Sequence, residues 1–320
     1  MADLNNAAEV PAVQCPCCAS YVELDPERAQ CSCGFEFRWR GRVIDLETGP
    51  DSFYEGRYAN EVYFDKRRLE RPGGRLLLHF LVYGYYEAIL RSVPAGGRIL
   101  DIGCAGGSKL LAEWGRVTGL DLSLPTLETA ASKYAWGVRA NACRVEFAPA
   151  SFLAIVSCFF WEHMRPPDKD LLLEKFSRWL RPGGKVVFLF DVASANPFFT
   201  WTRKDPDLFR EAFIEHDGHY GLESASAALR RFAEHGFSVC WWHAMNRSPV
   251  QDLPVLGWLE PYGRKHRWAQ AVSRAGKWIS NHRIPNRLYT GSLQLFDDTL
   301  GRLLPLDWSR ILLVVLEKPA

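Results

Sequence analysis

Two acidic residues near the ends of consecutive predicted strands mark the first candidate site. Asp101 lies in a hydrophobic run that leads into the glycine-rich loop 103–107, and Asp121 ends the next run, 20 residues further on. A strand that enters such a turn lets a ligand approach the backbone, and an acid at the end of the following strand can accept both hydroxyls of a ribose. The loop lacks the Gly-x-Gly-x-x-Gly spacing of a dinucleotide fingerprint, so its ligand need not carry a phosphate.

Cysteines form the second cluster of reactive side chains. Five of the nine lie between Cys15 and Cys33, in two short turns separated by 12 residues. Thiolates from two such turns suit tetrahedral zinc. A segment of about 45 residues cannot build a sufficient core alone, and a structural metal can supply the missing stability. The cluster therefore predicts zinc, and the alternative is a reduced cysteine cluster without metal.

The elements that would position these residues form an α/β pattern. Short aliphatic runs alternate with helical stretches, which predicts a mainly parallel sheet with helices between its strands. The seven predicted strands span residues 98–102, 116–121, 138–141, 152–158, 185–191, 237–242 and 309–317. Residues 53–90 read as two helices, and residues 49–52 as a linker rich in turn-forming residues. We expect a zinc-ribbon-like domain at 1–48, a helical linker or cap at 49–95 and a main domain at 96–320 that contains a helical insertion at 245–308.

Composition limits the classes of function. The chain has 320 residues, 48% of them hydrophobic and 24% charged, with a net charge of +2. This balance is ordinary for a globular protein and argues against a dedicated nucleic-acid binder. The first residues lack the features of a secretory signal, and the longest apolar stretch, 76–90, is shorter than the ~20 residues of a membrane span. We expect a cytoplasmic protein without a transmembrane segment.

Several motifs in sequence order resemble those of the class I S-adenosylmethionine-dependent methyltransferases. The first is Ile99-Leu100-Asp101-Ile102-Gly103-Cys104-Ala105-Gly106-Gly107, in which Ala105 replaces a glycine of the family pattern. Later landmarks lie at 152–157, 161–164, 180–185 and 236–237. The resemblance covers about residues 96–244 and the final strand. It implies a Rossmann-like seven-stranded sheet, a methyl-transfer activity and S-adenosylmethionine as cofactor, with S-adenosylhomocysteine as product.

The resemblance also implies roles for individual residues. Asp101 and Gly103 would cradle the amino acid part of the cofactor, and Asp121 would hold the ribose hydroxyls. Leu122 would flank the adenine, and Asn141, where many relatives have an acid, would hydrogen-bond the adenine edge. The remaining loop residues of the predicted cofactor site are Cys104, Ala105 and Gly107. The cysteine segment in turn resembles the zinc ribbons that precede some methyltransferase domains, which favours Cys15, Cys18, Cys31 and Cys33 as ligands, with Cys17 as a replacement for one of them.

Methyl transfer from a sulfonium is an in-line displacement, so alignment of the reactants supplies much of the catalysis. A general base would help, and the candidates at strand ends are Glu162, His163 and Asp191. We favour His163, and the alternative is that it orders the cleft around the cofactor. His216, His219 and Tyr220 lie in a polar loop, where they could face a substrate or, together with nearby acids, hold a second metal.

A basic amphipathic helix is predicted at 264–287. It contains seven Lys and Arg residues and no acid, and its apolar residues recur at helical spacing. The helix could contact an anionic or lipid-linked substrate and place the protein at a membrane periphery, or it could pack its apolar face on the sheet. We therefore predict a methyltransferase that modifies an oxygen or nitrogen of a small-molecule or glycan- or lipid-linked acceptor. The alternatives are an RNA methyltransferase, a membrane-associated lipid methyltransferase and a non-catalytic cofactor-binding scaffold.

Overall fold

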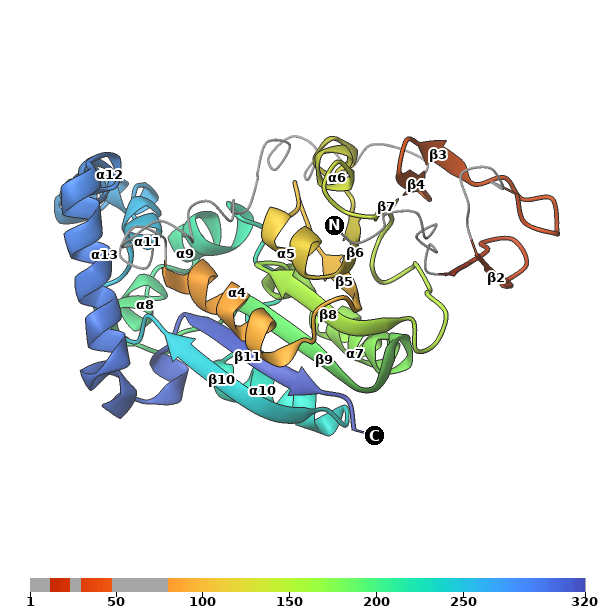
Figure 1. Ribbon diagram of the computed structural model, residues 1–320. Helices are drawn as coiled ribbons and strands as arrows, with labels where there is room; N and C mark the ends of the chain where they lie inside the picture. Colours follow the sequence, from red (N-terminus) through yellow and green to blue (C-terminus); the bar gives the residue numbers. More distant parts are fainter. Residues whose placement is uncertain (1–11, 24–29, 48–79, 320) are drawn as a thin grey trace.

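The chain is built around one mixed β-sheet with helices on both faces (Figure 1). The structure, a computed structural model, describes residues 12–23, 30–47 and 80–319. Within these ranges the sheet has nine strands in the order β10-β11-β9-β8-β5-β6-β7-β4-β3. Their bounds are β3 Arg38–Arg40, β4 Val43–Asp45, β5 Arg98–Ile102, β6 Arg116–Asp121, β7 Trp136–Arg139, β8 Phe152–Cys158, β9 Leu180–Asp191, β10 Ser238–Met245 and β11 Ile311–Glu317. β11 runs antiparallel to β9 and β10, β3 runs antiparallel to β4, and the other neighbouring pairs are parallel.

Two apolar layers cover the sheet, as expected for strands that are buried on both faces. Helices α4 (Phe80–Ser92), α5 (Lys109–Trp114) and α6 (Leu124–Ala131) pack on one face. Helices α7 (Pro166–Trp179) and α10 (Ala225–Glu234) pack on the other. The chain leaves β5 toward β6 and β7 on one side and returns to β8 on the other. This reversal places a crevice at the carboxyl ends of β5 and β8, the usual location of ligands in such sheets.

The predicted α/β fold is confirmed, with a correction to the number of strands. Strands occur at all seven predicted places, and the runs at 98–102, 116–121 and 152–158 match β5, β6 and β8 residue for residue. Seven strands is nevertheless wrong for the whole sheet, because β3 and β4 extend it beside β7. Residues 38–45 lie within the predicted ribbon-like domain at 1–48, but in the structure they form strands of the main sheet. The linker at 49–52 and most of the predicted helical region 53–90 lie outside the described residues.

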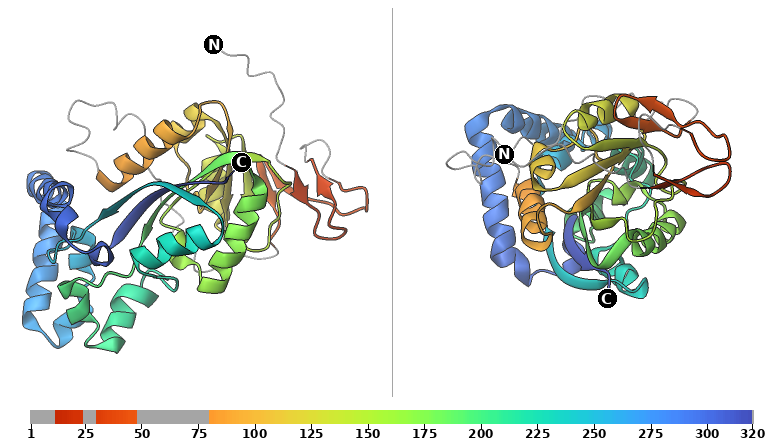
Figure 2. Two further views of the ribbon diagram at one scale, coloured as in Figure 1. Left: turned by 90° about the horizontal axis from the view of Figure 1, so that it is seen from below. Right: turned by 45° about the vertical axis from the view of Figure 1, so that its right-hand side comes forward.

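The cysteine-containing segment lies beside residues 146–148, in the stretch that connects β7 to β8. β1 (Val13–Gln14) pairs with β2 (Tyr21–Val22), and Val13 also forms a β-bridge with Phe147. Figures 1 and 2 show this segment and the helices near residue 280 at opposite ends of the molecule. No helix among the described residues combines the length and the apolar character that crossing a membrane requires.

Two separate stretches of chain form a helical lid beyond the carboxyl ends of the parallel strands. The first contains α8 (Pro197–Thr202), α9 (Pro206–Phe209) and the π-helix at Arg210–Glu215. The second contains α11 (Leu253–Gly257), α12 (Arg267–Asn281) and α13 (Arg283–Asp298), with short 3-10 turns at Pro261–Arg264, Leu300–Leu303 and Leu306–Trp308. One apolar cluster joins the stretches, and its buried members are Phe199, Leu208, Ala212, Phe213, Val255, Leu259, Tyr262 and Ala269.

The prediction of a single basic helix at 264–287 is wrong, because the chain breaks at His282 between α12 and α13. The apolar residues predicted to share one face do not form the buried face of α12; they are Trp268, Ala271, Val272, Ala275, Trp278 and Ile279. The helix buries the small residues Ala269, Ser273 and Gly276, while Trp268 and Trp278 stay exposed. A Cβ on Gly276 would lie 3.0 Å from Leu256, so the small residues let α12 approach α11 closely. Close helix packing, and not hydrophobicity alone, decides which face of α12 is buried.

Candidate active site

The loop after β5 turns on residues with left-handed backbone conformations. Gly103, Ala105 and Gly107 have φ angles of 64°, 43° and 68°. Ala105 adopts this conformation although it carries a Cβ, which disfavours positive φ. Its N–H donates to Oδ2 of Asp121 over 2.9 Å, and the N–H of Ser123 donates to Oδ1 over 2.9 Å. Asp121 therefore fixes the loop from the adjacent strand.

Asp101 supports the same loop from behind. The Tyr134 hydroxyl donates to Oδ2 of Asp101 over 2.6 Å and accepts a hydrogen bond from the N–H of Ser108 over 2.8 Å. Burial raises the pKa of Asp101 to about 7; the hydrogen bond from Tyr134 opposes this shift, and the nearby Asp121 carboxylate adds to it. The carboxyl group is thus part of a buried network that links the loop to α6 and the segment after it.

A cavity of about 310 Å³ opens at the carboxyl ends of β5 to β8. It brings together six of the residues predicted for cofactor binding and catalysis, namely Gly103, Ala105, Asp121, Leu122, Asn141 and His163. Asp101, Cys104, Gly107, Glu162 and Asp191 are not among its lining residues. Asp101, Cys104 and Gly107 lie in or behind the loop that forms one wall of the cavity, and their roles in cofactor binding stay predictions.

The three predicted catalytic residues have different surroundings. His163 lines the cavity, and its Nδ1 lies 3.1 Å from the carbonyl oxygen of Gly218. The side chain of Asp191 accepts two hydrogen bonds of 2.9 Å from Arg310, which also bonds Asp252. Burial raises the pKa of Asp191, although the Arg310 guanidinium lowers it. Glu162 is completely buried. Of the three, His163 therefore has the most direct access to a ligand, and the catalytic roles stay predictions.

The three candidate residues of the polar loop after the π-helix have different surroundings. The ring centroids of His219 and His163 are 5.3 Å apart, and the residue His219 is 8% exposed. His216 is exposed and pairs with Asp217, and Tyr220 is 53% exposed. His219 also lines a small hollow beneath the lid, together with Asp191, Phe213, Trp258 and Arg310. His163 and His219 therefore connect the cavity at the strand ends with the lid.

Comparison with known proteins decides the family. The family described as "Methyltransferase domain" matches residues 100–188, from β5 into β9. An uncharacterized methyltransferase from Geobacillus kaustophilus is 30% identical over 177 residues, which cover 49% of this chain and 77% of that protein. The chain belongs to the class I S-adenosylmethionine-dependent methyltransferases. S-Adenosylmethionine is therefore its methyl donor.

More distant similarities extend to other methyltransferases. Phosphoethanolamine N-methyltransferase 3 from Arabidopsis thaliana is 27% identical over 202 residues, which cover 57% of this chain and 38% of that protein. The crystal structure of geranyl diphosphate C-methyltransferase from Streptomyces coelicolor aligns with a TM-score of 0.48 and 16% identity, over 83% of this chain and 97% of that one. These similarities leave the acceptor of the methyltransferase described here unassigned.

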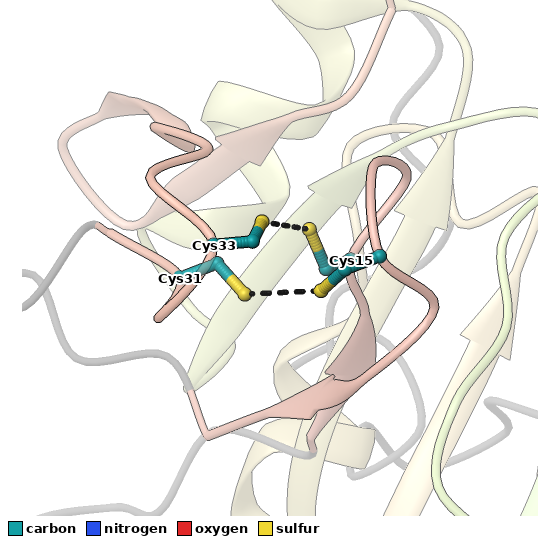
Figure 3. A group of neighbouring side chains, drawn as sticks. Cys15, Cys31 and Cys33 are labelled. Carbon is teal, nitrogen blue, oxygen red and sulfur yellow. Dashed lines mark hydrogen bonds between the residues drawn. The ribbon is translucent and has the colours of Figure 1, made fainter.

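The cysteine segment of the methyltransferase brings four thiols together (Figure 3). The sulfurs of Cys15 and Cys33 are 3.7 Å apart, and those of Cys18 and Cys31 are 3.5 Å apart. Regular tetrahedral coordination with Zn–S bonds of ~2.3 Å places sulfurs roughly 3.8 Å apart, so this donor set fits zinc. The sulfur of Cys17 lies outside the group of four, while the Cys17 N–H donates to the sulfur of Cys15 over 3.4 Å.

Sequence reasoning missed several residues of the methyltransferase site. The cavity is also lined by Thr126, Arg144, Phe159, Phe160 and Asp168. Phe159 and Phe160 directly follow β8, so their position at a strand end was a usable signal. Arg310 was overlooked as well, although a cation just before a strand of continuous apolar residues needs a partner. Its partners Asp191 and Asp252 come from distant parts of the chain, so the sequence pattern did not reveal the network.

Proposed function

We propose that this enzyme methylates an oxygen or nitrogen of a small-molecule acceptor, free or carried on a glycan or lipid, held between the cofactor cavity and the lid. The supporting observation is the contact between His163, which lines the cavity, and His219, which lines the hollow under the lid. Aromatic walls with a few polar groups suit a small ligand. The lid provides Phe213 and Trp258 next to Asp191 and Arg310.

Charge pairing in the lid favours a small acceptor over RNA. Three of the seven cations at 264–287 already contact acids: Arg264 pairs with Glu211, Lys265 with Asp205 and Lys277 with Glu260. An RNA-binding surface uses many unpaired Lys and Arg residues to neutralise phosphates. The net charge of the full sequence is only +2, so its charge balance gives RNA binding no further support.

The cavity lining supports the cofactor contacts that the family resemblance implies. Asp121 holds the ribose hydroxyls, Leu122 flanks the adenine, and Gly103 and Ala105 contact the amino acid part. Asn141 lies at the adenine end, where its Oδ1 already accepts from the Cys143 N–H over 2.9 Å. His163 then stands at the acceptor side, where aligning the acceptor atom with the methyl group and sulfur supplies much of the rate enhancement.

His163→Ala is expected to lower kcat by about 10²–10⁴-fold, the range for loss of a positioned acid–base group, with less than a threefold change in cofactor affinity. To find an acceptor for this measurement, the parent enzyme is first screened with a panel of hydroxyl- and amine-containing compounds, and release of S-adenosylhomocysteine is the readout. The exposed His216→Ala is the matched control. Equal losses of turnover and cofactor affinity would instead make His163 a cleft-ordering residue. Tight cofactor binding without turnover on a broad panel would favour the scaffold alternative.

A lipid-linked acceptor is the second candidate, because α13 carries an exposed apolar stripe. Ile284, Leu288 and Leu295 are 68%, 67% and 66% exposed, and Arg283 and Arg287 lie on the same helix. Apolar residues beside cations favour binding at an anionic membrane surface.

We expect the enzyme to sediment with phosphatidylserine-containing vesicles and the Ile284→Asp/Leu288→Asp variant to lose at least about tenfold in partitioning. Leu171→Asp, on α7, serves as the control because Leu171 is also exposed. Equal sedimentation of both variants with the parent would remove the membrane from this proposal.

We propose finally that Cys15, Cys18, Cys31 and Cys33 hold a structural zinc ion. The sulfur spacing supports this ligand set, and so does the small size of the segment between β1 and β3. Zinc would stabilise the two turns that carry the thiols and, through them, strands β3 and β4 at the end of the sheet.

A further inference from the structure

We propose that Glu162, His163 and His219 form a second metal site, which binds a divalent transition-metal ion between the cofactor cavity and the lid. This inference deepens the proposed function of the cleft. The catalytic role of the ion rests on the proposed function. Binding of the ion does not, because it can be measured with neither acceptor nor methyl donor present.

The three side chains converge from two segments of the chain. Glu162 and His163 lie in the 3-10 turn Trp161–His163 that follows β8, and His219 lies after the π-helix. One ligand atom from each residue lies within 4.8 Å of the other two. Tetrahedral coordination with bonds of ~2.0–2.1 Å needs separations of roughly 3.4 Å, which small side-chain rotations can supply.

Backbone contacts hold these segments together. The N–H of Gly221 donates to the carbonyl oxygen of Glu162 over 2.8 Å. A Cβ at Gly221 would lie 1.8 Å from the carbonyl oxygen of Met164, so glycine is required for this close approach. The donor set is thus built into the fold on a fixed backbone.

The buried carboxylate of Glu162 is the second observation that points to a cation. Glu162 has no exposed surface, and neither of its carboxylate oxygens accepts a hydrogen bond within the described part of the chain. A carboxylate in this state is costly to bury.

Nearby cations are committed to other partners. Lys169 bonds the carbonyl oxygen of Gly221 over 2.6 Å and Glu223 over 2.7 Å, and Arg310 bonds Asp191 and Asp252. Protonation would remove the charge of Glu162 but would leave a buried hydroxyl that still needs a partner. A metal ion would satisfy the carboxylate directly.

The orientation of His163 fits a ligand role. Its Nδ1 lies 3.1 Å from the carbonyl oxygen of Gly218, so Nδ1–H donates there and Nε2 carries the lone pair. Metal-binding histidines commonly use their second nitrogen in this way. Two imidazoles and one carboxylate suit Zn²⁺ or Fe²⁺ and leave coordination positions open. Bound to an acceptor hydroxyl, such an ion would lower the pKa of that hydroxyl, and the ion would then take over the role of general base that the proposed function gives to His163.

Cobalt titration of the metal-stripped full chain tests this site separately from the cysteines. Co²⁺ bound to thiolates gives intense near-ultraviolet charge-transfer absorption, whereas Co²⁺ on imidazole and carboxylate gives only weak visible bands. We expect two equivalents in the parent protein, one of each type. Glu162→Gln and His219→Ala should retain the thiolate signal and weaken the other site at least about 100-fold, because loss of outer-shell partners alone costs about 10–100-fold.

His216→Ala is the matched control and should retain both equivalents. If His219→Ala fails to fold, as judged by circular dichroism, His219→Gln replaces it. A single, thiolate-type equivalent in the parent protein, or unchanged binding in Glu162→Gln and the His219 variant, would overturn this inference. The proposed function fails separately, if no acceptor in the panel is methylated.

Discussion

Asp121→Ala is expected to weaken S-adenosylmethionine binding at least about tenfold, or by at least ~1.5 kcal/mol. Two effects contribute to this loss. The carboxylate faces the cavity, where it would accept the ribose hydroxyls, and it also holds the N–H groups of Ala105 and Ser123 over 2.9 Å each. Truncation therefore removes a ligand contact and also loosens a loop whose Ala105 already has a strained backbone. Calorimetric titration with S-adenosylmethionine and S-adenosylhomocysteine measures the change.

Glu128→Ala is the matched control, because Glu128 is an exposed acid on α6 close to Asp121 in sequence. Asp121→Asn separates charge from shape, since an amide oxygen can still accept from one of the two N–H groups. An Asp121→Ala variant with unchanged affinity would exclude Asp121 from the cofactor site. An equal loss in Glu128→Ala would show that the effect is not local.

Cys31→Ser is expected to lower the zinc content by about one equivalent per chain and the melting temperature by roughly 10 °C. Structural zinc can supply ~10–16 kcal/mol to the folding of an isolated domain. In a domain of ~150–250 residues, each kcal/mol of lost stability lowers Tm by ~2–4 °C, so a loss of a few kcal/mol suffices for this shift. Loss of zinc should also disturb the cofactor site, because residues of and next to β4 contact the end of β7 and Asn141. Asp45 pairs with Arg139 over 3.3 Å, and the Asn141 N–H donates to Glu47 over 2.7 Å.

Metal analysis of protein purified without chelators, together with thermal melts, provides the test. Cys17→Ser is the control and should keep its zinc, because Cys17 is exposed and its sulfur lies outside the group of four. Parent protein without zinc in the cysteine segment, or Cys31→Ser with a full zinc content, would refute the ligand assignment. Loss of metal in both variants would mean that Cys17 also takes part in coordination.

The sequence was sufficient where the signal is local. The hydrophobic runs before Gly103 and up to Asp121 predicted β5 and β6 residue for residue, since strands buried on both faces read as continuous apolar segments. The 20-residue spacing of Asp101 and Asp121 placed both acids near the cofactor loop. Paired cysteine turns likewise identified the four thiols that the fold brings together.

Tertiary structure decided which distant segments meet. Asp191 and Arg310 are 119 residues apart, and their pairing depends on β9 and β11 being neighbours in the sheet. The meeting of His219 with Glu162 and His163 depends on the path of the chain back across the carboxyl ends of the strands. Periodicity shows that a helix has an apolar face but not which surface will cover it, so the buried small residues of α12 were missed. The pairing of β4 with β7 was missed for the same reason, because a short-range pattern predicts an element, whereas packing across the whole fold decides its neighbours.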